Sequence, residues 1–137
     1  MKKRLFAAAM ILVMVLTAAV GAYADTGAQT RDTDSVSFIT NRTGRTTADV
    51  SILVNFSEEV DRYNIVVYLQ KKENGVWVED SSNDEYVFYN NGGGIDYGTF
   101  NHTYTSLVSG VNYRIKCISK DYIGSTVYTT TSYSNQF

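Results

Sequence analysis

Few side chains in this sequence are of the types that carry out catalysis. His102 is the single histidine and Cys117 the single cysteine. A zinc site built from several imidazoles needs more than one histidine, and a nucleophile needs a base and an orienting group that the spacing does not supply. Asn101 and Thr103, which flank His102, indicate an ordinary strand position. The sequence therefore predicts a protein that is not an enzyme and has no catalytic residues.

Two acidic stretches and one glycine run are the remaining candidates for ligand chemistry. The carboxylates from Glu58 to Asp61 and from Asp80 to Glu85 could hold calcium or flank a glycosidic bond. Neither stretch has the spacing of a calcium loop, and the run from Gly92 to Gly94 lacks the lysine and the helix of a phosphate loop. We therefore expect no metal site and no cofactor, with the glycines forming a flexible connection.

The aromatic content indicates a binding surface. Ten tyrosines and Trp77 remain after the first 24 residues, more than a small domain needs for its core. Side chains alternate along a strand, so Trp77 faces water if Val76 and Val78 face inward, and Tyr68 faces away from its aliphatic neighbours. Exposed tryptophan and tyrosine can stack on sugars or hold a protein contact. Trp77 and Tyr68 are thus possible ligand-binding residues; packing of Trp77 within its own hairpin is the alternative.

The N-terminus has the three parts of a secretory signal. The cationic residues Lys2 to Arg4 precede an apolar run from Leu5 to Val20, and Ala22-Tyr23-Ala24 has the small-x-small form that signal peptidase cleaves. A permanent membrane helix is the alternative, but the run is shorter than the roughly 20 apolar residues of a membrane span. The prediction is a signal peptide at residues 1–24, a secreted protein and no stable membrane insertion.

Charge and cysteine content limit the partners and the fold. Loss of Lys2, Lys3 and Arg4 leaves nine basic against 14 acidic residues, a net charge near −5. This balance argues against nucleic acid and anionic lipid as partners, because both require a cationic face. One cysteine permits no intrachain disulfide, so the core alone must stabilise the fold. Cys117 itself is expected to be a small buried side chain, with a reactive thiol as the alternative.

The remainder of the chain is typical of a β-protein. Proline is absent, and Thr, Ser, Val, Ile and Tyr are abundant. Residues 25–34 are expected to be flexible, and residues 35–137 to form one antiparallel β-sandwich of about seven strands. Val50, Ile52 and Val54 alternate along one of these strands, and Asn74-Gly75 predicts a tight hairpin. Seven or eight strands are expected among the candidate segments Ser35 to Thr40, Thr47 to Phe56, Tyr63 to Lys71, Val76 to Glu79, Glu85 to Tyr89, Thr99 to Leu107, Asn112 to Ser119 and Val127 to Tyr133.

One segment resembles a known family. The stretch Leu107-Val108-Ser109-Gly110-Val111-Asn112-Tyr113 has the Leu-x-x-Gly-x-x-Tyr spacing of fibronectin type III and related immunoglobulin-like sandwiches. The resemblance implies structural roles for Leu107, Gly110 and Tyr113, the tyrosine closing a connection between the sheets. It also implies that Tyr113, Ile115 and Cys117 point inward and that Arg114 and Lys116 lie in water.

The combined interpretation is a secreted, non-enzymatic binding module that recognises a protein or a cell-surface polymer. A carbohydrate-binding domain is the first alternative, and a structural or self-associating extracellular β-protein is the second. The sequence leaves the oligomeric state open.

Overall fold

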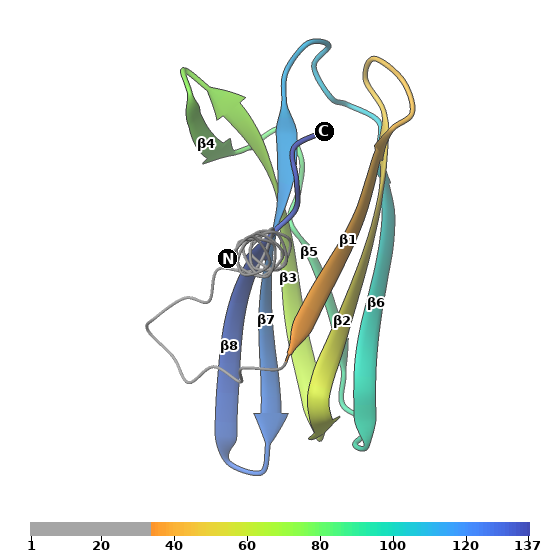
Figure 1. Ribbon diagram of the computed structural model, residues 1–137, viewed down its shortest axis with the longest axis vertical. Helices are drawn as coiled ribbons and strands as arrows, with labels where there is room; N and C mark the ends of the chain where they lie inside the picture. Colours follow the sequence, from red (N-terminus) through yellow and green to blue (C-terminus); the bar gives the residue numbers. More distant parts are fainter. Residues whose placement is uncertain (1–33) are drawn as a thin grey trace, which may run out of the picture.

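The computed structural model describes residues 34–137, which form eight β-strands and no helix (Figure 1). In this described range there is accordingly no helix long and apolar enough to cross a membrane. The expected signal peptide at residues 1–24 and most of the expected flexible segment lie outside it. The strands are β1 Ser35–Arg42, β2 Ala48–Val60, β3 Arg62–Glu73, β4 Val76–Glu79, β5 Tyr86–Asn90, β6 Ile95–Tyr104, β7 Tyr113–Ile123 and β8 Thr126–Tyr133.

The strands form two antiparallel sheets, which confirms the prediction of an all-β antiparallel fold and is consistent with a sandwich. Sheet A has the order β1-β2-β6, and sheet B the order β4-β3-β7-β8. The fifth strand also pairs with β3, so β4 covers one end of β3 and β5 covers the other. In Figure 1 sheet A lies at the right, and the β4 hairpin projects at the upper left, away from it.

The strand boundaries differ from the predicted ones by up to four residues, at the ends of β2 and β7 and at the start of β6. This strand begins at Ile95, four residues before the predicted start, because Ile95 pairs with Val60 beyond an irregularity in β2. Gly98 lies within the strand although glycine usually weakens one. A β-carbon at Gly98 would lie 2.8 Å from Cζ of Tyr63, so the tyrosine ring occupies the space that any other side chain would need.

The core lies between the two sheets and follows the predicted alternation. Val50, Ile52 and Val54 of β2 are buried on one face. From β7, Tyr113, Ile115 and Cys117 are also buried, as the resemblance implied. Other members of the core are Ala48, Phe56, Val60, Tyr63, Ile65, Val67, Leu69, Ile95, Tyr104 and Leu107.

Aromatic rings join the sheets on the side where β5 faces β6. Phe88 of β5 stacks on Phe100 of β6, with ring centroids 5.3 Å apart. The ring of Tyr86 lies 4.1 Å from that of His102, and His102 lies 4.6 Å from Tyr104. These contacts hold a strand of sheet B against a strand of sheet A.

The connection from β6 to β7 is fixed by the residues that the sequence singled out. Leu107 is buried and its amide donates to the carbonyl of Thr46 at 3.0 Å. The amide of Val108 donates to the hydroxyl of Tyr113 at 2.8 Å. Gly110 has a φ of 78°, a backbone conformation that favours glycine.

Arg42 completes this connection from the end of β1. Its guanidinium donates to the carbonyls of Val108 at 2.9 Å and Val111 at 3.1 Å, and to that of Arg45 at 2.6 Å. The guanidinium carbon also lies 5.4 Å from the centre of the Tyr113 ring. One arginine of sheet A therefore satisfies backbone carbonyls in the segment that leads into sheet B.

We expect Tyr113→Phe to lower the free energy of unfolding by about 1–2 kcal/mol, because the amide of Val108 loses its acceptor while the ring still fills the core. Urea unfolding measures the change as a lower midpoint at constant m-value. Tyr97→Phe is the matched control, because its ring is 59% exposed. Equal midpoints for the two variants would contradict this role of the Tyr113 hydroxyl.

Candidate functional site

Tyr68 and Trp77 both lie on the outer face of sheet B. The alternation predicted around Tyr68 is confirmed, because Val67 and Leu69 are buried and Tyr68 is half-buried on the opposite face. The assumption that Val76 faces inward is wrong, since it is 61% exposed. The reason is that β4 pairs only with the last four residues of β3, at a hairpin that sheet A does not cover.

Trp77 takes part in an aromatic–arginine row, defined as Trp77 of β4, Arg114 of β7 and Tyr133 of β8. The guanidinium carbon of Arg114 lies 4.6 Å from the centre of the Trp77 ring and 4.2 Å from that of Tyr133. Each such cation–π contact contributes about 0.5–1 kcal/mol at an exposed site. Arg114 is consequently half-buried, which corrects the expectation that it lies in water.

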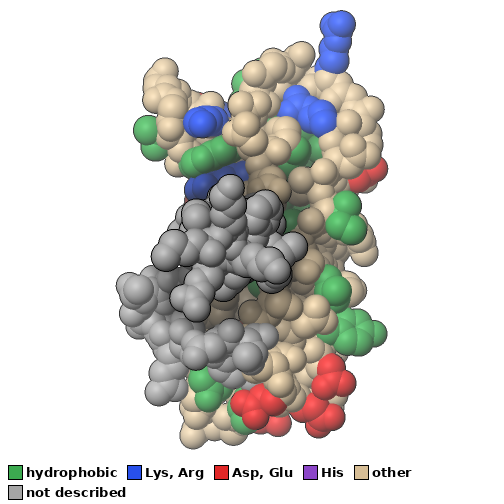
Figure 2. Space-filling model, in the orientation of Figure 1, with side chains coloured by type: hydrophobic (Ala, Val, Ile, Leu, Met, Phe, Trp, Pro, Cys, Tyr) green, Lys and Arg blue, Asp and Glu red, His purple; other side chains and the backbone are tan. Residues whose placement is uncertain are grey.

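A second cation, Lys72, reaches the same tryptophan. The Nζ of Lys72, which pairs with Trp77 across the hairpin, lies 5.5 Å from the centre of its ring. Figure 2 shows Lys and Arg side chains above and below a hydrophobic side chain at the upper left, where Figure 1 places β4. Trp77 thus packs among cations of its own sheet and is only half-exposed.

Tyr68 has a similar neighbour. The Nζ of Lys116 lies 5.4 Å from the centre of the Tyr68 ring and 3.2 Å from a carboxylate oxygen of Glu79. Lys116 is half-buried by these contacts, which again corrects the expectation of a side chain in water. Burial, and then the nearby carboxylates of Glu85 and Glu79, raise the pKa of Tyr68.

The charge of Arg114 is not neutralised within the described chain. Its Nε donates to Oε1 of the buried Gln70 at 2.7 Å, and burial lowers its pKa. Among residues 34–137, no carboxylate pairs with Arg114 or Lys72, whereas Lys71 and Lys116 each pair with a glutamate. Within residues 34–137 the two terminal nitrogens of Arg114 donate to no other side chain, and a guanidinium can bind a carboxylate in a bidentate arrangement.

The two side chains considered for catalysis lie elsewhere. Cys117 is buried in the core, and burial raises the pKa of its thiol to about 12. His102 lies between Tyr86 and Tyr104 in the aromatic contact of β5 with β6, and burial lowers its pKa. The structure therefore does not bring His102 or Cys117 onto the outer face of sheet B.

The acidic turn after β4 is organised by its own hydrogen bonds. Asp80 is buried, and its carboxylate accepts from the amide of Ser82 at 3.1 Å and from Nδ2 of Asn83 at 2.9 Å. Lys71 approaches the same carboxylate at 3.9 Å. In the part of the chain that the structure describes, no three His, Cys, Asp or Glu side chains are grouped to hold a metal ion.

Comparison with known proteins assigns neither a family nor a function. No family model matches the sequence. No curated protein matches it either. A search of solved structures matches a crystal structure of a protein from Archaeoglobus fulgidus, with 13% sequence identity, coverage of 75% of this chain and 94% of that chain, and a TM-score of 0.37.

We expect the thiol of Cys117 to be unreactive toward a thiol-specific reagent at neutral pH, because it is buried and its pKa is raised to about 12. The same reagent should modify it fully in denaturant. Release of the chromophore from a disulfide reagent measures both rates. Reaction in the folded protein at the rate of the unfolded one would contradict this assignment.

His102 should make the protein less stable in mild acid. Burial lowers the pKa of His102 in the folded state. Below the unfolded value of about 6.5 the unfolded chain therefore binds more protons than the folded protein. As a result, the free energy of unfolding decreases as the pH is lowered. Urea midpoints measured from pH 7.5 to 5 should fall more steeply than those of His102→Gln. The carboxylates are common to both proteins, so parallel curves would exclude this contribution.

Proposed function

We propose that this protein is a secreted, non-enzymatic interaction module built on a fibronectin III-like or immunoglobulin-like sandwich. The pairing orders β1-β2-β6 and β4-β3-β7-β8 support this classification, as does the bond from the Val108 amide to the Tyr113 hydroxyl. Secretion rests on the three-part signal at residues 1–24.

The proposed contact surface is the outer face of sheet B around the aromatic–arginine row. Tryptophan, tyrosine and arginine are the residue types that contribute most to the binding energy of protein interfaces. Trp77, Arg114 and Tyr133 lie together there, with Tyr68 alongside. Their mutual packing fixes the side chains before a partner binds, which reduces the entropy that binding costs.

The observation that carries the proposal is that the guanidinium of Arg114 has no carboxylate partner among residues 34–137. A half-buried cation that has no acidic partner in the described chain favours a partner that supplies a carboxylate. The exposed Lys72 adds a second positive charge beside Trp77. Because the face is a sheet surface rich in interface residue types, we infer that the partner is an exposed acidic segment of another protein.

The test is a binding screen against intact cell surfaces, their extracted proteins and a glycan array. We expect Trp77→Ala and Arg114→Gln each to weaken binding to a protein partner at least tenfold, the loss of about 1.4 kcal/mol or more. Ile39→Ala is the matched control, since Ile39 is 71% exposed on the other sheet.

If Trp77→Ala keeps its circular dichroism spectrum and binds as well as the unaltered protein, the outer face of sheet B is not the contact surface. Binding to glycans alone would favour a carbohydrate-binding domain. Self-association without any other ligand would favour a structural protein.

A further inference from the structure

The first strand, β1, forms an edge of sheet A (orange in Figure 1). Among residues 34–137 it pairs with β2 and with no other strand, so the backbone groups on its other side have no ladder partner there. The pairing with β2 is continuous over all eight residues, from Ser35 opposite Asn55 to Arg42 opposite Ala48. An edge of this length and regularity can accept a further strand.

This edge has none of the features that usually protect an edge strand. Charged side chains, proline and bulges are the common means of preventing strand addition. The segment from Ser35 to Asn41 contains no charged residue, and the sequence contains no proline. The register between β1 and β2 has no shift, and Ile39 is 71% exposed. Another strand can therefore approach β1 without meeting a charge or a bend.

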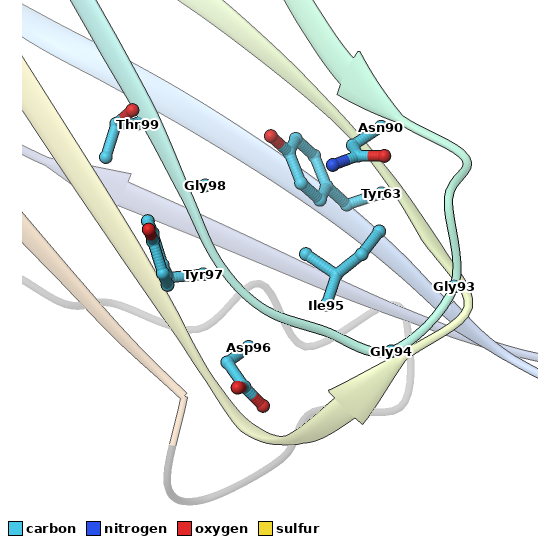
Figure 3. Close-up of a pocket in the computed structure, with 9 residues that line it drawn as sticks. All are labelled: Tyr63, Asn90, Gly93, Gly94, Ile95, Asp96, Tyr97, Gly98 and Thr99. Atoms are coloured by element: carbon cyan, nitrogen blue, oxygen red, sulfur yellow. The ribbon is translucent and has the colours of Figure 1, made fainter.

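The opposite edge of sheet A, formed by β6, is different. Its register with β2 contains a shift, and Figure 3 shows the first part of β6 curving past Tyr63. Further along the strand, Phe100 stacks on Phe88 of β5. Because a bend and a covering strand both hinder strand addition, β1 is the more accessible edge of this sheet.

The edge of sheet B formed by β8 also lacks charged residues, but its inner face is polar. Thr130 and Ser132 lie opposite inward-facing residues of β7, and their hydroxyls are buried without a hydrogen-bond partner among residues 34–137. Val36 and Phe38 of β1, in contrast, are apolar and pack against the core. A strand added to β1 would therefore extend an apolar inner face, which favours its addition there.

Space for the side chains of such a strand lies next to β1. A hollow of about 300 Å³ is bounded by Val36, Ser37, Phe38 and Thr40, and on its other side by residues 133–135 at the end of β8. Val36 and Phe38 are only partly buried. Apolar side chains of an incoming strand would cover them further, which stabilises the pairing.

We propose that β1 pairs with β1 of a second copy of this chain, in antiparallel orientation about a two-fold axis at Phe38. Phe38 then lies opposite its own counterpart, Val36 opposite Thr40, and Ser35 opposite Asn41. Residues opposite each other in an antiparallel pair lie on the same face, so the inward-facing side chains of both copies stay on the inner side. The two three-stranded sheets become one sheet of six strands.

The charges at the ends of β1 favour this register and this partner. It places Asp34 opposite Arg42 of the second copy at both ends of the ladder, and opposite charges in such positions are favourable. A register centred on Ile39 would instead place Arg42 opposite Val36. The same segment thus supplies both an accessible edge and an uncharged strand, with complementary ends, that fits it.

Sedimentation equilibrium of the purified protein tests dimer formation. We expect a monomer–dimer equilibrium with a Kd on the order of 10 μM, because a single pair of eight-residue strands makes an interface at the small end of the usual range. A mass that stays at that of the monomer up to about 1 mM protein, far above such a Kd, would overturn the proposal.

Charge substitutions at Ser35 and Asn41 test the register. Both side chains are exposed, and in the proposed dimer each lies opposite the other. Ser35→Glu with Asn41→Lys creates two attractive pairs per dimer, whereas Ser35→Lys with Asn41→Lys creates two repulsive pairs. We expect a Kd about tenfold lower for the first variant than for the second, with a smaller difference at about 1 M salt. Equal values for the two variants would contradict pairing through β1.

The dimer is independent of the contact proposed for the outer face of sheet B. Trp77→Ala should dimerise as the unaltered protein does, because Trp77 belongs to β4. Loss of the dimer in this variant would assign self-association to the aromatic–arginine row and exclude the β1 edge. Ile39 faces outward from sheet A, so Ile39→Ala leaves the backbone ladder of the dimer in place.

Discussion

The connection from β6 to β7 passes from one sheet to the other without a strand partner for its backbone. Its polar groups are satisfied by the Tyr113 hydroxyl and by the guanidinium of Arg42, which bonds the carbonyls of Val108 and Val111. Buried backbone groups left without partners would oppose folding. This connection leads directly into β7, and Tyr113, which accepts the hydrogen bond from the Val108 amide, is also the residue at which β7 begins to pair with β3, opposite Lys71.

The aromatic–arginine row depends on this pairing register. Arg114 lies opposite Gln70, and Lys116 lies opposite Tyr68. A slip of one residue would turn Arg114 toward the core, because alternate side chains of a strand face opposite sides. The candidate site is therefore a product of strand register, although none of its members belongs to the connection itself.

The sequence identified features that depend on near neighbours. Alternation in β2 and the spacing from Leu107 to Tyr113 are local, and the structure has both. The roles of Arg42 and Arg114 depend on contacts between segments that are distant in the sequence. Arg42, for example, bonds a carbonyl 69 residues away, at Val111. The alternation of side chains along a strand does not predict such contacts. Gly98 likewise lies outside the predicted strands, and only the ring of Tyr63 explains a glycine within β6.

The way β3 is covered has a consequence for aggregation. A long unpaired strand edge is a template for another chain, and this domain has no disulfide to resist such growth. One edge of β3 is divided between β4, with four residues, and β5, with five. The amide of Asp80 bonds the carbonyl of Leu69 between them. On this side sheet B offers an incoming strand only two short, interrupted edges, which hinders its extension into a fibril.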